Sequence, residues 1–296
     1  MRSVLITGAS CFIGKPLMKK LLEQGYKVYA VVRQPEKITF SHQELHIIKC
    51  DMKDYAKLTA LIDDKIDIFY HLAWNGTRGS DRLNEEMQRE NTVYSLNAVK
   101  IAHELGAKAF VGIGSQAEYG NCEGIVTEDY PAAPTTAYGE EKLEVCIRGR
   151  QMADKLGMKF LWPRIFSAYG VGDYEGTLVI SSLRKMLRNE PVQLSVCTQI
   201  WDFLNIHDVV SALISLPQAE SGVYNFASGE YRVLKEYVEE MKKLAGSSSE
   251  LMYGTNPNAM VVSFMPNSNK LKRAINWKPK VSFEAGINEI INSMRN

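Results

Sequence analysis

The stretch SVLITGASCFIGKPLMKKLLEQG, residues 3–25, decides the fold of the first half of the chain. An apolar, β-branched run passes through a glycine-containing turn into a helical pattern, which is the order of a βα unit. The N-terminus of a helix offers unpaired N–H groups and a partial positive charge to a pyrophosphate. The turn therefore predicts a dinucleotide-binding loop, and a plain packing turn is the alternative.

The turn keeps two of the three glycines of a GxxGxxG pattern, Gly8 and Gly14, but Cys11 occupies the middle position. Gly14 allows the helix to pack closely on the strand, whereas the Cβ of Cys11 stands where close approach to a phosphate is usual. Because the positive end of a helix dipole lowers the pKa of a nearby thiol, we expect Cys11 to be reactive and to be covered by a bound cofactor. A small apolar filler under the helix is the alternative.

Short runs rich in Val and Ile alternate with helical patterns through the first half of the chain, including a long helix predicted over about residues 81–105. This alternation predicts an α/β fold of the Rossmann type, a doubly wound parallel sheet. We expect residues 1–166 to form the cofactor-binding domain, with a later strand and helix near 201–216 returning to it. Residues 167–296 mainly form a smaller C-terminal substrate-binding lobe, and the cleft between the two is the expected site.

The charge balance, with 35 Lys and Arg against 34 Asp and Glu, predicts neither a nucleic-acid track nor an attraction to acidic membranes. No apolar run approaches the ~20 residues of a membrane span, and the first residues do not have the pattern of a signal peptide. The five cysteines are scattered and lack metal-ligand spacing, so reduced thiols and no metal site are expected. These features favour a cytoplasmic protein with a small, locally recognised ligand.

The second strand indicates which dinucleotide the loop prefers. NAD-binding folds usually end this strand in an acidic residue that bonds the ribose 2′-hydroxyl. Here Val32 and Arg33 stand near that place, and a guanidinium suits a 2′-phosphate, so NADP(H) is favoured over NAD(H). An exposed arginine at a strand end is the alternative. Further along, Asp51 could accept a bond from the adenine amino group or cap the next helix.

A candidate catalytic group follows the later strands. Ser115 stands at the carboxyl end of a predicted strand, and Tyr138 and Lys142 lie four residues apart on one helix face. A tyrosine of ordinary pKa, ~10, transfers protons poorly at neutral pH, but an adjacent ammonium is expected to favour the phenolate and lower that value. The hydroxyl of Ser115 could hold the substrate oxygen with which Tyr138 exchanges a proton.

With this ordered set, the chain resembles the extended short-chain dehydrogenase/reductases that act on nucleotide-linked sugars. The resemblance covers nearly the whole chain. It runs from TGASCFIG at 7–14 through HLAW at 71–74, Asn91, Ser115, the Tyr138/Lys142 pair, PRIFSAYG at 163–170, DFLNIHDVVSAL at 202–213 and GVYNFASGE at 222–230 to INWKPKVSFEAGI at 275–287. It implies that Tyr138 is the acid/base, that Lys142 lowers its pKa and binds the nicotinamide ribose, that Ser115 orients the substrate carbonyl, and that Asn91 supports a proton-relay water. The implied cofactor contacts are Gly8, Cys11, Phe12, Ile13, Gly14, Arg33, Asp51, Met52, Leu72, Ala73, Trp74, Tyr138, Lys142, Pro163 and Ile165.

Departures from the family's patterns narrow the expected chemistry. Sugar 4,6-dehydratases of this family carry an Asp-Glu pair directly after the serine or threonine, where this chain has Gln116 and Ala117. One type of 3,5-epimerase/reductase has a cysteine at the place of Ala117. Dehydration and epimerisation by enolisation are therefore disfavoured, because their usual groups are missing.

Two further departures concern the substrate's pyrophosphate. Ser167 and Trp201 replace an asparagine and an arginine that many relatives have. Other cations are then candidates for that contact, although the helix that carries most of them is more often a solvated face. These candidates are Arg184, Lys185, Arg188 and Arg232.

The preferred interpretation is an NADPH-dependent reductase of a nucleotide-linked 4-keto-6-deoxy sugar, with the proton supplied by Tyr138. One alternative is a nucleotide-sugar C4-epimerase or dehydrogenase with tightly bound NAD. Another is a non-catalytic NADP(H)-binding sensor. Dimer packing through two helices is common in the family, so a homodimer is compatible with the resemblance.

Overall fold

The computed structural model describes residues 2–256 and 262–295. Its centre is a parallel sheet in the order β13-β8-β5-β4-β1-β2-β3, and the short β6 also pairs with β8. The strands are β1 (Ser3–Thr7), β2 (Lys27–Val32), β3 (Leu45–Lys49), β4 (Ile68–His71), β5 (Ala109–Gly112), β6 (Gly114–Ser115), β8 (Lys159–Ile165) and β13 (Gly222–Phe226). The predicted doubly wound Rossmann-type sheet is confirmed.

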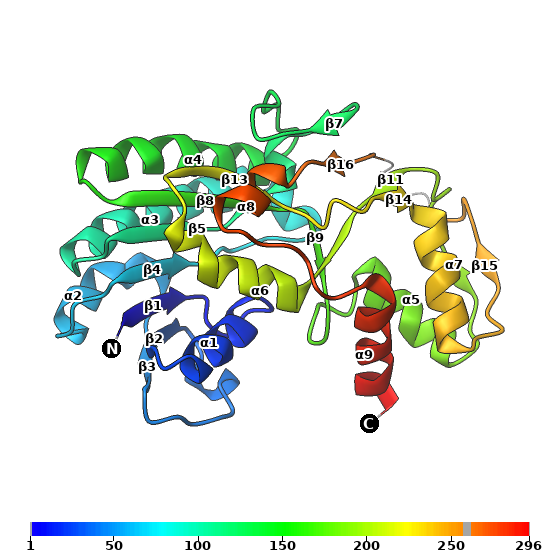
Figure 1. The fold of residues 1–296 in the computed structure, drawn as a ribbon, viewed down its shortest axis with the longest axis horizontal. Coiled ribbons are helices and arrows are strands. Elements are labelled where there is room, and N and C mark those ends of the chain that lie inside the picture. The colour runs from blue at the N-terminus through cyan, green and yellow to red at the C-terminus, as the bar shows by residue number, and fades with distance from the viewer. Residues whose placement is uncertain (1, 257–261, 296) are drawn as a thin grey trace.

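Helices cover both faces of this sheet, as Figure 1 shows. In β1, Val4 and Ile6 enter the core under α1 (Gly14–Glu23) and α6 (Ile206–Ser215), whereas Leu5 enters the core under α3 (Glu85–Glu104) and α4 (Ala137–Lys155). Successive side chains of a strand point to opposite faces, so a strand buried on both faces is apolar throughout. That is why polar and apolar residues do not alternate along the run SVLIT.

A second lobe continues from the end of β8. Its core lies among α5 (Leu178–Leu187), α7 (Leu234–Ala245) and α9 (Phe283–Arg295), grouped at one end of the molecule in Figure 1. Short strand pairs accompany it: β9 (Ser167–Tyr169) with β12 (Phe203–Asn205), β11 (Ile200–Trp201) with β14 (Arg232–Val233), and β10 (Val192–Gln193) with β15 (Leu251–Met252). The chain returns to the first lobe through α6, β13 and α8 (Asn269–Ala274).

The helix predicted over residues 81–105 is shorter than expected. The α3 helix begins at Glu85, because the side chain of Asn84 caps it by accepting a bond from the Met87 amide at 3.1 Å. Residues Gly79–Leu83 instead form a separate 3-10 turn, η3. An asparagine side chain in the N-cap position accepts a hydrogen bond from a backbone amide of the first turn. This bond stabilises a helix that starts at the next residue. No helix among the described residues is long and apolar enough to cross a membrane.

Candidate active site

The glycine turn joins β1 to α1 beside the end of β4. Gly8 has a φ of +69°, and a Cβ added there would lie 2.7 Å from the backbone nitrogen of Ala73. A Cβ on Gly14 would collide with the carbonyl oxygen of Gly8. Both positions therefore need glycine, since the strand, the turn and the helix approach too closely for a side chain. Cys11 is not among the residues of positive φ, so a side chain is sterically tolerated there.

The thiol of Cys11 lies inside the turn, where its Sγ accepts a bond from the amide of Gly14 at 3.2 Å. Burial raises the pKa of Cys11 and outweighs the opposing bonds from the amides of Gly14 and Ile13. The expectation of a lowered thiol pKa is therefore wrong. Its reasoning counted the helix dipole but not the desolvation of the thiolate, which is the larger effect at this position.

A cavity of about 250 Å³, here called the glycine-turn cavity, opens beside the turn. Its lining includes seven of the predicted cofactor contacts, namely Gly8, Cys11, Arg33, Met52, Leu72, Ala73 and Trp74. Asp51 is not part of this lining. It caps the 3-10 segment η2 (Met52–Lys57), because its side chain accepts a bond from the amide of Lys53 at 3.3 Å.

The mouth of the glycine-turn cavity is positively charged. Arg33 is exposed at the end of β2, and Lys37 lies four residues further on in the same lining. Among the residues that the structure describes, Arg33 makes no ion pair. Sequence reasoning missed Lys37, which the chain brings back to the cavity through a short 3-10 turn over Pro35–Lys37. An unpaired guanidinium at this place is available to an anionic group.

A second and larger cavity of about 630 Å³, here called the lobe cleft, lies between the two lobes. Ser115 and Tyr138 line it from the first lobe together with Phe12, Ile13 and Ile165, whereas Pro163 is buried within β8 and lines neither cavity. The second lobe contributes Ser167, Tyr169, Ser182, Lys185, Gln199 and Trp201, among others. The tertiary structure thus places the serine and tyrosine on the wall of a space large enough for a sugar and its linked phosphates.

Burial raises the pKa of Tyr138 above its ordinary value. A hydrogen bond with Ser115 and the charge of Arg82 oppose this rise, and the charge of Glu118 adds to it. The expectation that Lys142 lowers the pKa of this phenol below its ordinary value is therefore wrong. The desolvation of a buried phenolate exceeds the help it receives from nearby groups, so Tyr138 is protonated at neutral pH.

Lys142 is buried with its ammonium group held by two neighbours. Its Nζ donates to the carbonyl oxygen of Ile113 at 2.7 Å and lies 3.6 Å from the ring centroid of Trp74. The same Nζ is 5.8 Å from the ring centroid of Tyr138. Burial lowers the pKa of Lys142 to about 7, although the charge of Glu118 opposes this fall. The ammonium of Lys142 therefore interacts more directly with the indole ring of Trp74 and the carbonyl oxygen of Ile113 than with the phenol of Tyr138.

The polar side-chain atoms of Asn91 form hydrogen bonds with the loop after β4. Its Oδ1 accepts from the amide of Asn75 at 2.9 Å, and its Nδ2 donates to the carbonyl oxygen of Asn75 at the same distance. The neighbouring Gln88 on α3 is equally buried. The side chain that the resemblance assigned to a proton-relay water thus holds the loop that borders the site.

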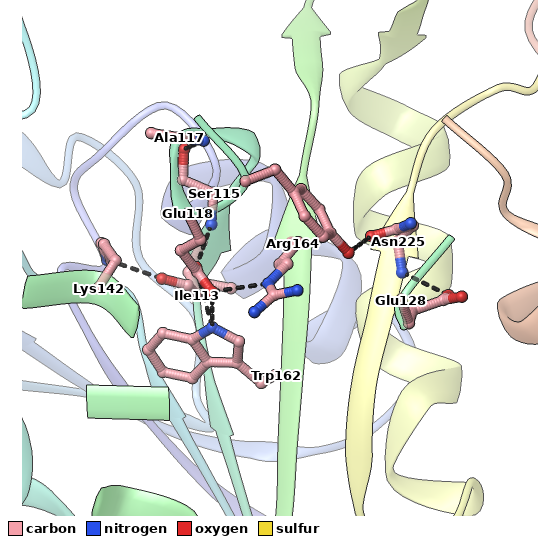
Figure 2. Close-up of polar contacts among 10 residues, drawn as sticks. Ile113, Ser115, Ala117, Glu118, Glu128, Lys142, Trp162, Arg164 and Asn225 are labelled. Atoms are coloured by element: carbon pink, nitrogen blue, oxygen red, sulfur yellow. Dashed lines mark hydrogen bonds and ion pairs between the residues drawn. The ribbon is translucent and has the colours of Figure 1, made fainter. Parts of the chain in front are cut away.

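Glu118, which the sequence analysis did not select, is a buried carboxylate directly behind Ser115. It is fully buried and accepts bonds from the amide of Ser115 at 2.8 Å, from Nε1 of Trp162 at 3.0 Å and from Nε of Arg164 at 2.7 Å (Figure 2). The Oγ of Ser115 in turn accepts a bond from the amide of Ala117, and the two bonds together form a capping box around η4 (Gln116–Glu118). The spacing of serine and glutamate in SQAE is the signal that would have found it.

The four cations considered for the substrate's pyrophosphate separate in space. Lys185 lines the lobe cleft, whereas Arg184 pairs with Glu175 at 2.6 Å and Arg232 pairs with Glu240 at 2.7 Å outside it. Arg188 also lies outside the cleft, beside Glu190 at 3.9 Å. Sequence reasoning missed Arg78, which lines the cleft from the loop after β4 and stacks 4.3 Å from the ring centroid of Tyr174.

The sheet, the glycine turn and the Ser/Tyr/Lys group together define an NAD(P)-dependent enzyme of the extended short-chain dehydrogenase/reductase type. The chain belongs to the NAD dependent epimerase/dehydratase family, whose model matches residues 4–227. The family predicted from the motifs is thereby confirmed, as is the prediction of an NAD(P)-dependent enzyme.

Individual members of the family are similar over nearly the whole chain. CDP-abequose synthase from Salmonella muenchen is 24% identical over 98% of this chain and 97% of its own length. The structure of UDP-glucose 4-epimerase from Thermotoga maritima with UDP-glucose matches with a TM-score of 0.88 at 23% identity, covering 99% of this chain and 98% of that one. The structure of MoeE5 with UDP-glucuronic acid and NAD matches with a TM-score of 0.86 at 26% identity, covering 99% of each chain.

Proposed function

We propose that this protein reduces C4 of a nucleotide-linked 4-keto-6-deoxy sugar with NADPH as the hydride source. The observation that supports this most is the position of Tyr138 beside Ser115 on the wall of the lobe cleft, where desolvation raises the pKa of the phenol and keeps it protonated at neutral pH. A reductase needs a proton donor at that place, whereas oxidation of a sugar hydroxyl begins with a proton acceptor. The similarity to CDP-abequose synthase over almost its full length supports a nucleotide-sugar substrate.

The residues of the glycine turn fit a dinucleotide. Its two glycines leave no room for side chains between β1, α1 and β4, and the positive end of the α1 dipole lies at the turn. Arg33 and Lys37 at the mouth of the glycine-turn cavity suit a 2′-phosphate, which supports NADPH over NADH. The bound cofactor would supply the hydride that reduces the substrate carbonyl.

The protein groups have separate tasks in this reaction. The hydroxyl of Ser115 orients the substrate carbonyl oxygen toward Tyr138, and Tyr138 donates its phenolic proton to that oxygen as negative charge develops there. Lys185 and Arg78, the cations that line the cleft, suit the nucleotide diphosphate. The residues after Ser115 are Gln116 and Ala117, so no acid–base pair is present there to eliminate water.

A turnover screen tests the proposal. Purified protein would be mixed with NADPH or NADH and with CDP-, dTDP-, GDP- and UDP-linked 4-keto-6-deoxy sugars, and loss of the reduced-nicotinamide absorbance would be followed. We expect turnover with one of these sugars and NADPH, and a Tyr138→Phe variant that binds NADPH normally but loses most of its rate. Binding of NADPH without turnover of any sugar would contradict the proposal and favour the non-catalytic sensor.

A C4-epimerase with tightly bound NAD is the second candidate. The MoeE5 structure holds UDP-glucuronic acid and NAD, and it shares the fold over 99% of both chains. An epimerase of this type retains its cofactor through the catalytic cycle, so NAD would be released when the purified protein is denatured. Recovery of NAD in nearly equimolar amount, together with C4 inversion of a nucleotide sugar without added cofactor, would replace the reductase proposal.

A further inference from the structure

We propose that Arg82 is a positioning residue for the proton transfer by Tyr138, supplying a cation at the face of the phenol ring. The inference rests on the acid–base role of Tyr138 in the proposed function. Neither the motifs of the sequence nor the resemblance singled out this arginine, which lies in η3 between β4 and α3.

The placement of Arg82 over the catalytic ring is direct. Its guanidinium carbon lies 4.7 Å from the ring centroid of Tyr138, closer than the 5.8 Å that separates the ammonium of Lys142 from the same centroid. The Nε of Arg82 is buried without a hydrogen-bond partner, and Arg82 makes no ion pair within residues 2–256 and 262–295. Its charge is therefore not neutralised by a carboxylate and acts on the phenol.

Buried amide groups on α3 hold this arginine in place. Nε2 of Gln88 donates to the carbonyl oxygen of Asp81 at 2.9 Å and to that of Gly76 at 2.8 Å. The Oε1 of Gln88 accepts a bond from Nε1 of Trp74 at 2.7 Å. Gln88 is fully buried, so one side chain ties both ends of the loop to a rigid helix. The backbone directly before Arg82 is thereby held to α3, and its guanidinium lies over the ring of Tyr138.

Three groups on three elements act on the phenol of Tyr138, namely Ser115 on β6, Arg82 on η3 and Glu118 on η4. The hydrogen bond with Ser115 and the positive charge of Arg82 both lower the pKa of the phenol, whereas the charge of Glu118 raises it. Lys142 lies one turn away on the same helix, but its ammonium is bonded to Ile113 and covered by the Trp74 ring. Arg82 is therefore the cation that acts most directly on the phenol.

This placement serves the reduction step. Bound NADPH would supply a hydride to the carbonyl carbon, and the carbonyl oxygen would take the proton from the Oη of Tyr138. The phenolate that remains carries a negative charge in a buried site until solvent returns a proton. A cation over the face of the ring stabilises that phenolate, and it does so without touching the sugar.

Replacing Tyr138 by 3-fluorotyrosine gives one fluorine resonance whose shift reports the ionisation of this phenol without any substrate. The titration would be compared in the Arg82→Met and Arg82→Lys backgrounds, with Arg89→Met as the matched control. Arg89 is an exposed arginine one helix turn into α3 that pairs with Glu85 at 2.9 Å. Arg82→Gln would take the place of Arg82→Met if the latter variant does not fold.

We expect the titration midpoint to rise by about one pH unit in Arg82→Met, to recover by more than half in Arg82→Lys, and to stay unchanged in Arg89→Met. With a turned-over sugar, the fall of kcat at high pH should move in the same direction. A midpoint that stays within about 0.2 pH units in Arg82→Met would overturn the inference. A shifted midpoint in a protein that turns over none of the sugars would leave the role of Arg82 intact and refute the reductase proposal instead.

Discussion

Removing the carboxylate of Glu118 is expected to weaken both the fold and the candidate active site. The side chain is fully buried and satisfies three donors, on Ser115, Trp162 and Arg164, as Figure 2 shows. In Glu118→Ala, the side chain of Arg164, which is only 5% exposed, keeps its positive charge without a counter-ion. The amide of Ser115 also loses the acceptor that fixes the start of η4.

The magnitude follows from the burial of both partners. Breaking a buried ion pair on one side costs about 3–5 kcal/mol, because the remaining charge is left desolvated and unpaired. The two uncharged donors each lose a buried bond, which places the expected loss of unfolding free energy at the upper end of that range. For a chain of 296 residues, this loss corresponds to a fall in Tm of roughly 5–8 °C.

Urea unfolding followed by circular dichroism would measure the change, with Glu90→Ala as the matched control. Glu90 is an exposed glutamate in the second turn of α3 that makes no ion pair with any residue the structure describes, so its removal should change the unfolding free energy by less than about 0.5 kcal/mol. A Glu118→Met/Arg164→Met double variant should recover part of the loss, because no buried charge remains. If Glu118→Ala were destabilised by less than about 1 kcal/mol, the reasoning from burial would be refuted.

Three further outcomes are expected. Arg33→Ala should weaken NADPH binding by roughly ten- to 150-fold, the loss of a charged hydrogen bond, and leave NADH binding nearly unchanged in calorimetry; equal affinity of the unmodified protein for both cofactors would refute this. Burial lowers the pKa of Lys142 from 10.5 to about 7. Between these two pH values the lysine is protonated in the unfolded chain and neutral in the folded protein, so the free energy of unfolding should rise with pH by up to about 1.4 kcal/mol per pH unit. Denaturant titrations at several pH values should show this slope in the parent and not in Lys142→Met, and equal slopes would count against it. Because burial raises the pKa of the Cys11 thiol, iodoacetamide should label it more slowly than free cysteine near neutral pH, and saturating NADPH should slow it further; peptide mapping that finds fast labelling indifferent to NADPH would contradict both points.

Local patterns in the sequence were sufficient to predict the fold and to select the main candidate site residues. The run SVLIT and the turn after it predicted the first βα unit, since a strand buried on both faces must be apolar and a tight turn must contain glycine. Ser115, Tyr138 and Lys142 were selected from their order and spacing, and the structure places Ser115 and Tyr138 on the wall of the lobe cleft, with Lys142 buried behind it and bonded to the carbonyl oxygen of Ile113. The start of α3 at Glu85 was missed, because a single capping side chain decides a helix boundary that periodicity leaves open.

The electrostatics of the site depended on tertiary structure. Whether Lys142 or Arg82 supports the phenol of Tyr138 depends on which cation lies over the ring, and these two residues are far apart in the sequence. The thiol of Cys11 and the phenol of Tyr138 both have raised pKa values because burial removes water from their charged forms. Spacing along a chain tells which groups are neighbours on one helix. The water and charges around a group depend on segments distant in sequence, so only the folded chain decided how these residues ionise.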